Sequence, residues 1–214
     1  VYPLERGMFE FGVGWSEFCE DDLDLSAIIF HDNEPKAPPL YESADRLSAD
    51  TVFYNSQHGN GVWSGGDSQT GKGKGDNEVI YIDMNNTKTH AKAKPWKEST
   101  TAVYLVLSVF RSCCYNTFLT SGNFHISVRA PVLGDFGTLA TFKPPPIPIC
   151  ANHLIIGAIY KNDTRPGGWD FLAVGETLSD HHGQVNVHHG NVNVGNVKSA
   201  LEEHYKNYLA APSP

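Results

Sequence analysis

Carboxylate side chains are concentrated in one glycine-rich stretch of the sequence, which covers residues 65–78 and reads GGDSQTGKGKGDNE. The apolar run Val79–Ile82 follows it directly. Asp67, Asp76 and Glu78 supply hard oxygen donors, and the glycines allow the backbone to take positive φ and to approach a ligand closely. Ca²⁺ takes about six to eight oxygen ligands in a flexible geometry, so this stretch predicts a calcium-binding loop.

Two other interpretations of the loop remain open. Residues 66–73 follow the pattern G-x-x-x-x-G-K-G, in which Gly73 stands where a phosphate-binding P-loop requires Ser or Thr. A P-loop also lies between a strand and a helix, whereas a strand-like run follows this loop. The other alternative is a solvated hairpin loop made of turn-forming residues. The spacing of the acidic residues does not match an EF-hand.

Two further carboxylates, Asp22 and Asp24, stand just before the apolar run Ser26–His31, which predicts a buried strand. Residues two positions apart in an extended chain point to the same side, so these two carboxylates are expected to lie together. An acidic turn exposed to solvent is the alternative interpretation.

Two histidine doublets, His181-His182 and His188-His189, lie in a segment rich in Gly, Asn and Val. Such doublets can bind Zn²⁺ or Ni²⁺. Asp180 is the nearest carboxylate, and imidazoles in a flexible segment do not form a preorganised site. We therefore expect an adventitious or structural role for these histidines, and the competing hypothesis is a metal-dependent hydrolase.

The length and composition predict one large domain, because the chain has 214 residues, of which 40% are hydrophobic and 11% aromatic. The formal net charge of −8 argues against nucleic acid or an anionic membrane as a general partner. No apolar stretch of about eighteen residues could span a membrane, and no signal-peptide pattern is present at the start. The cysteines form no C-x-x-C pair, which favours reduced thiols and a cytoplasmic location. They are Cys19, Cys113, Cys114 and Cys150.

Alternating or wholly apolar runs predict nine or so short strands. Ala102–Phe110 is the longest and is expected to be the central strand, and the last two are expected to form a hairpin. The predicted strands are Met8–Val13, Ser26–His31, Thr51–Asn55, Val79–Ile82, Ala102–Phe110, Phe124–Arg129, Phe136–Phe142, His153–Tyr160 and Trp169–Val174.

A helix is predicted from Asn196 onwards, because an apolar stripe recurs there at helical spacing. The fold class is therefore all-β, a two-sheet β-sandwich with a C-terminal α-helix that packs on a sheet. The sandwich domain is expected over residues 1–178, a linker over 179–195, and the helix and tail over 196–214. The stripe consists of Val197, Leu201, Tyr205 and Tyr208.

Several segments follow one another in an order that is typical of one protein family. They are Gly12–Trp15, Asp22–Ala27, Val52–Asn55, Gly66–Gly71, Gly75–Ile80 and Ala173–Gly175. Over roughly residues 8–178 the chain resembles the TerD family of tellurite-resistance and stress proteins. The resemblance implies a β-sandwich that binds Ca²⁺ through the central loop and the Asp-x-Asp turn. The family is associated with resistance to tellurite, chemical stress and phage, without established enzymatic activity.

The chain departs from the family pattern in the loop itself. Ser68 replaces the usual Asn, and Lys72 and Lys74 stand where acidic residues are usual; Ser16 likewise replaces an acidic residue after Gly14-Trp15. The family pattern implies two ions. Five carboxylates against two lysines leave a local charge of −3, which suits one Ca²⁺, and a lysine ammonium is hypothesised to replace the second ion.

We therefore expect a non-enzymatic, Ca²⁺-binding β-sandwich that serves as a stress-response scaffold or adaptor, with protein partners through a complex or self-association. No G-x-S-x-G or H-E-x-x-H signature supports an enzyme. The alternative is a structural subunit of a larger assembly with a degenerate metal site. The expected ligands are the side chains of Asp22, Asp24, Asp67, Asp76 and Glu78 and the carbonyls of Gln69 and Gly71.

Overall fold

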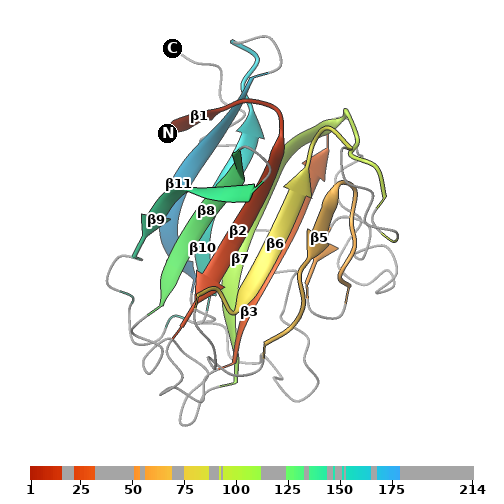
Figure 1. Cartoon of the computed structure of the whole chain (residues 1–214). Coiled ribbons are helices and arrows are strands. Elements are labelled where there is room, and N and C mark those ends of the chain that lie inside the picture. The colour runs from red at the N-terminus through yellow and green to blue at the C-terminus, as the bar shows by residue number, and fades with distance from the viewer. Residues whose placement is uncertain are drawn as a thin grey trace.

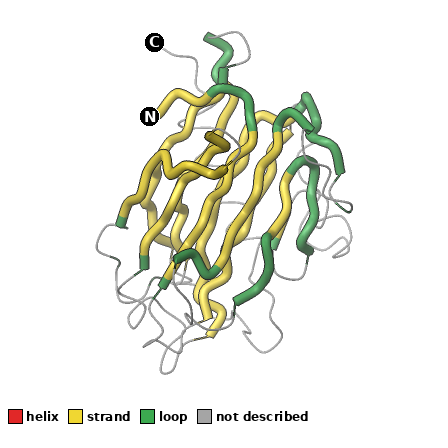
Figure 2. Tube along the Cα trace, in the orientation of Figure 1, coloured by secondary structure: helices red, strands yellow, loops and turns green. Residues whose placement is uncertain are grey.

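All regular structure in the described part of the chain is β-strand, as Figures 1 and 2 show. The structure is a computed structural model of the whole chain. The described residues are 1–15, 22–31, 51–53, 56–68, 75–86, 92, 94–111, 124–132, 135–143, 147, 151, 153–164 and 168–178. None of them belongs to a helix long and apolar enough to cross a membrane.

The strands form two antiparallel sheets, one of six strands and one of five. The six-stranded sheet has the spatial order β1 (Tyr2–Leu4), β11 (Trp169–Leu178), β10 (His153–Lys161), β7 (Thr100–Arg111), β3 (Asp22–His31) and β4 (Thr51–Val52). The five-stranded sheet has the order β5 (Val62–Ser64), β6 (Glu78–Asp83), β2 (Met8–Gly14), β8 (His125–Val132) and β9 (Asp135–Phe142).

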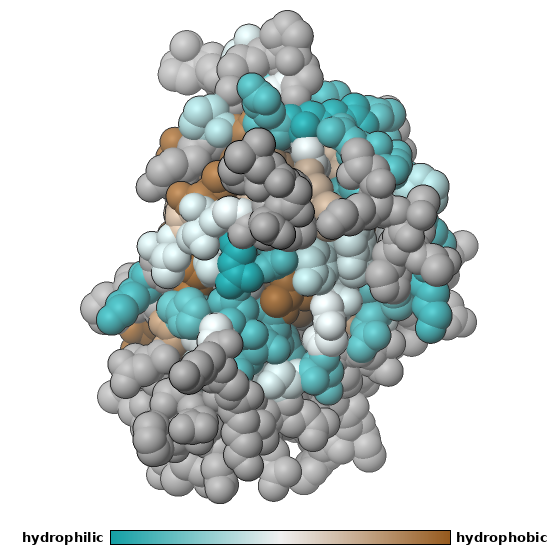
Figure 3. All heavy atoms as spheres, in the orientation of Figure 1, coloured by the Kyte–Doolittle hydropathy of each residue, from teal (hydrophilic) through white to brown (hydrophobic). Residues whose placement is uncertain are grey.

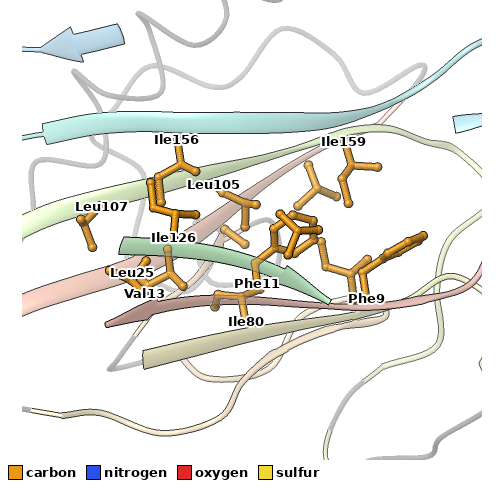
Figure 4. Close-up of a cluster of buried hydrophobic side chains, with 14 of the residues drawn as sticks. Phe9, Phe11, Val13, Leu25, Ile80, Leu105, Leu107, Ile126, Ile156 and Ile159 are labelled. Carbon is orange, nitrogen blue, oxygen red and sulfur yellow. The ribbon is translucent and has the colours of Figure 1, made fainter. Parts of the chain in front are cut away.

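The two sheets pack face to face over one hydrophobic core, and Figure 4 shows its side chains between the layers. Phe9, Phe11 and Val13 enter this core from β2, because alternate residues of a strand point to one side. Leu105 and Leu107 enter it from β7 on the opposite sheet. Fully burying one such side chain stabilises the fold by roughly 1.5–3 kcal/mol, so this core is the main source of stability.

Part of the outer face of the six-stranded sheet is also apolar and buried. Tyr104 and Val106 alternate with the core residues of β7 and are 0% and 1% exposed. They belong to a second cluster with Ile28, Ala102, Ile155 and Ala158. The predicted helix over 196–214 and the linker over 179–195 lie outside the described residues, so the packing of that helix on a sheet stays a prediction.

Each of the nine predicted strands overlaps a strand of the structure, although β4 covers only Thr51–Val52 of the predicted Thr51–Asn55 and β3 begins earlier than predicted, at Asp22. Ala102–Phe110 falls within β7, which lies between β10 and β3 in the six-stranded sheet, and the last two strands pair as the expected antiparallel hairpin. The sequence missed β1 and β5, each of only three residues, because such short strands carry no periodic signal. The four cysteines and both histidine doublets fall outside the described part.

Replacing Leu105 by alanine is expected to lower the free energy of unfolding by about 2–5 kcal/mol, because its 0% exposed side chain leaves a cavity in the core. Leu139→Ala is the matched control: Leu139 is 52% exposed, so the change should stay within about 0.5 kcal/mol. Urea denaturation followed by circular dichroism measures both. Equal losses would contradict the assigned core.

Candidate metal centre

Asp22 and Asp24 lie at the beginning of β3, on the face of the six-stranded sheet that points away from the core. Leu23 and Leu25 alternate with them and enter the core. Both carboxylates are nevertheless shielded from solvent, with exposures of 7% and 3%. The prediction that these two residues lie on one side of a strand is therefore confirmed.

Asp67 joins them from the loop that follows β5. One carboxylate oxygen from each of Asp22, Asp24 and Asp67 lies within 4.8 Å of the other two. Oxygens that share one Ca²⁺ lie about 2.3–2.6 Å from the ion and hence up to about 5 Å from one another, so this separation fits a single ion. Asp67 is exposed, which places the opening of the group on its side.

Glu78, at the start of β6 in the other sheet, adds a fourth carboxyl group to this region. Its Oε2 accepts a hydrogen bond from the Leu25 N–H at 2.5 Å, and its Oε1 accepts one from the Ser68 N–H at 3.3 Å. The Leu25 N–H is accessible because the described part of β4 pairs with β3 only at Ala27 and Ile28. Glu78 thus links β3, the loop after β5 and the five-stranded sheet.

The buried carboxyl groups in this region hold their protons unusually tightly. Burial raises the pKa of Asp24 to about 7, and repulsion from Asp22 and Asp67 adds to the effect. Burial raises the pKa of Glu78 to about 9, with added repulsion from Asp24 and Asp67 and opposition from the two backbone hydrogen bonds. Negative charge is therefore costly here, because the carboxylates are desolvated and close together.

The side chain of Asp24 carries a buried oxygen that has no hydrogen-bond donor. Asp24 Oδ2 is buried and accepts no hydrogen bond from the protein. A buried oxygen without a donor costs roughly 1–3 kcal/mol, and more when it is charged. Either a proton or a bound cation would relieve that cost, so the donor set and its surroundings fit a hard metal ion.

Asp76 does not join this group, although the sequence pattern placed it with Asp67 and Glu78. Its side chain lies on the outer face of the five-stranded sheet, where it is 2% exposed. It accepts a hydrogen bond from Ser127 Oγ at 2.7 Å, lies 3.1 Å from His125 Nε2 and forms an ion pair with Arg129. Gln69, Gly71, Lys72, Lys74 and Ser16 lie outside the described residues.

Sequence reasoning missed two polar residues beside Asp24. Ser108 on β7 pairs in register with Asp24 on one side and with His153 of β10 on the other. Ser108 Oγ lies 2.8 Å from His153 Nδ1, and the two residues are 1% and 5% exposed. Asp24, Ser108 and His153 come from distant parts of the sequence, so only the strand register shows that they lie in one row across the sheet.

The comparisons with known proteins identify the fold. A crystal structure of a protein of unknown function, SAV2460, matches with a TM-score of 0.55 and 18% identity over 80% of this chain and 89% of that one. A crystal structure of a homologue of the telluride resistance protein TerD, SCO6318 from Streptomyces coelicolor A3(2), matches with a TM-score of 0.54 and 15% identity over 81% of this chain and 89% of that one. The chain therefore has a TerD-like fold. No protein-family model matches it, and no curated protein matches it significantly.

The metal-free protein is expected to lose stability as the pH rises from about 5 to about 9. The unfolded chain has ordinary carboxyl pKa values, so between those values and the raised values of about 7 for Asp24 and about 9 for Glu78 the folded state binds more protons. Stability then falls by up to about 1.4 kcal/mol per pH unit for each group. Denaturant titrations in chelator at several pH values measure this slope.

Neutral variants provide the control for this pH dependence. Asp24→Asn and Glu78→Gln should each flatten the slope, and at high pH metal-free Asp24→Asn should be more stable than the wild type. Asp163→Asn, in the loop after β10 with an 87% exposed side chain, should leave the slope unchanged. A metal-free protein that becomes more stable towards high pH would contradict this account of the carboxyl groups.

Proposed function

We propose that this protein is a Ca²⁺-binding β-sandwich of the TerD type in which Asp22, Asp24, Asp67 and Glu78 hold one ion. The observation that carries the proposal is the buried Asp24 Oδ2, which accepts no hydrogen bond from the protein and lies in a group of three converging carboxylates. Asp24 and Glu78 both have raised pKa values, because burial and neighbouring carboxylates disfavour their charged forms. A divalent cation would replace the protons that the metal-free site retains.

The chemistry of the donors favours Ca²⁺ over other metals. The three converging side chains are all aspartates, and Glu78 adds further carboxylate oxygens. Hard oxygen donors suit Ca²⁺ and Mg²⁺, whereas Zn²⁺ and Cu²⁺ favour imidazole and thiolate ligands. Mg²⁺ requires a near-ideal octahedron and retains water, while Ca²⁺ accepts irregular sets drawn from several segments. This donor set comes from β3, β6 and a loop, which favours Ca²⁺.

An ion at this position would strengthen the connection that Glu78 already makes between the two sheets and the loop through its two hydrogen bonds. Asp22 and Asp24 belong to the six-stranded sheet, Glu78 belongs to the five-stranded sheet, and Asp67 belongs to the loop after β5. Calcium would then fix the loop surface around Asp67, which a protein partner could recognise. This is the basis for the proposed role as a non-enzymatic, cytoplasmic stress-response scaffold or adaptor.

Calorimetric titration of the chelator-treated protein with Ca²⁺ is expected to show binding of one ion together with a rise in the melting temperature. At a free Ca²⁺ concentration about 100-fold above the dissociation constant, the added stability should be about 2.7 kcal/mol. Asp24→Asn should abolish binding, because it removes the most buried aspartate of the group. Asp67→Asn should weaken it, and the matched control Asp163→Asn should bind as the wild type does.

Two results would contradict this function. Absence of both heat and a shift in melting temperature would favour the alternative, a structural subunit of a larger assembly in which protons alone stabilise the carboxyl groups. Equal Ca²⁺ affinity in Asp24→Asn and the wild type would show that any bound ion sits elsewhere on this acidic chain.

A further inference from the structure

A row of interacting side chains crosses the outer face of the five-stranded sheet. Trp63 of β5 stacks on Tyr81 of β6 with ring centroids 5.4 Å apart, and Tyr81 hydrogen-bonds to Glu10 of β2. Glu10 in turn forms an ion pair with Arg129 of β8. The strand register pairs Trp63 with Tyr81, Tyr81 with Glu10, and Glu10 with Arg129, so the row crosses four neighbouring strands. Figure 3 shows this face, where hydrophilic residues gather over the middle.

The end of the acidic loop lies over this same face. Arg129 pairs with Asp76 as well as with Glu10, so one guanidinium joins β2, β8 and the loop. The side chain of Asp76 packs directly against the backbone of Gly12, where an added Cβ would lie 2.1 Å from Asp76 Oδ2. At Gly14 an added Cβ would lie 2.3 Å from the carbonyl oxygen of Gly75. Both glycines of β2 are therefore required for the loop end to lie this close.

The two described ends of the loop thus have different anchors. Its first part, around Asp67 and Ser68, lies at the carboxylate group and contacts Glu78. Its last part is attached to the outer face through Asp76, and through Asn77, whose side-chain oxygen accepts a hydrogen bond from the Trp15 N–H at 2.8 Å. Glu78 follows directly and enters the space between the sheets. The position of Glu78 is therefore set by where the preceding residues are held.

We propose that Arg129 is a positioning residue for the cation site: by holding Asp76 against the outer face, it places Glu78 where its two oxygens reach Leu25 and Ser68. This inference rests on the proposed function. In it Asp76 is a partner of Arg129 and contributes no oxygen to the ion.

The energetics of the Arg129 contacts support a positioning role. The side chains of Asp76 and Glu10 are 2% and 8% exposed, and that of Arg129 is 27% exposed. A guanidinium presents several donors in a fixed plane and can hold two carboxylates at once in a defined geometry. Removing one partner of such a buried pair leaves an uncompensated charge. The loop end would then move to find solvent or another cation, and Glu78 would move with it.

Calcium titrations of the full-length variants test this proposal. Arg129→Met and Asp76→Asn should each weaken Ca²⁺ binding about tenfold or more, the size typical of residues that orient metal ligands, with the number of bound ions unchanged. Arg129→Lys should restore part of the affinity, because a point charge can hold one carboxylate but not both in the same geometry. Glu98→Gln, which removes the exposed carboxylate partner of Arg6, is the matched control and should bind normally.

A second readout separates positioning from direct ligation. Tb³⁺ can replace Ca²⁺ in oxygen sites, and its luminescence lifetime reports how many water molecules it coordinates. Saturated Asp76→Asn and Arg129→Met should have the wild-type lifetime, because every ligand side chain is still present and the bound ion itself holds Glu78 in place at saturation. Glu78→Gln should have a shorter lifetime, because water replaces a protein oxygen.

Arg129→Met leaves two buried carboxylates without a cation, so it is accompanied by the triple variant Arg129→Met, Asp76→Asn, Glu10→Gln, which buries no unpaired charge. Weakened binding with an unchanged lifetime in the triple variant supports the proposal. A shortened lifetime in Asp76→Asn would overturn it, and so would wild-type affinity in the triple variant. If the wild type itself binds no ion, the proposed function fails and this proposal fails with it. Binding that depends on Asp24 but not on Arg129 removes this proposal alone.

Discussion

Repulsion among carboxylates that the fold gathers at the beginning of β3 is the constraint on which the rest of the site depends. Asp22, Asp24 and Asp67 converge there, and Glu78 approaches from the other sheet. Water would screen these charges on an open surface, but here most of them are buried, and burial together with the repulsion raises the pKa values of Asp24 and Glu78. Two backbone N–H groups donate to Glu78, whereas Asp24 Oδ2 accepts no hydrogen bond from the protein. A proton or a cation would offset the negative charge at Asp24, and this is the physical basis of the proposed calcium site.

Asp76 and Glu78 are separated by a single position in the sequence, but their negative charges are offset by different partners. Asp76 is neutralised by Arg129, a cation that the chain carries itself, together with Ser127. Glu78 has backbone donors and neighbouring carboxylates. A lysine of the loop was hypothesised to substitute for an ion, and those lysines lie outside the described residues. The internal cation that the structure places beside a loop carboxylate is an arginine of β8. Asp76 thus has partners within the protein, whereas Asp24 Oδ2 accepts no hydrogen bond from it.

The fold of this protein and its candidate site depend on different properties of the sequence. Solved structures with 15–18% identity share the sandwich over about four fifths of the chain. A core of buried aliphatic and aromatic residues between two sheets tolerates such divergence, because volume and pattern matter more than identity. The position of Asp76 is more restricted, because Gly12 must lack a side chain for Asp76 to lie where it does.

The sequence by itself determined the strands and the acidic segments. Alternation and apolar runs are local properties, so β7 and β6 could be located from Ala102–Phe110 and Val79–Ile82 alone, and Asp22 and Asp24 could be assigned to one side of a strand. Only the tertiary structure decided which carboxylates meet. β6 begins only at Glu78, so strand alternation does not hold between Asp76 and Glu78, and their side chains lie on opposite faces of the five-stranded sheet. The partner that holds Asp76 on the other face, Arg129, is 53 residues away along the chain. Contacts between residues this distant depend on strand register and sheet packing, and no local pattern records them.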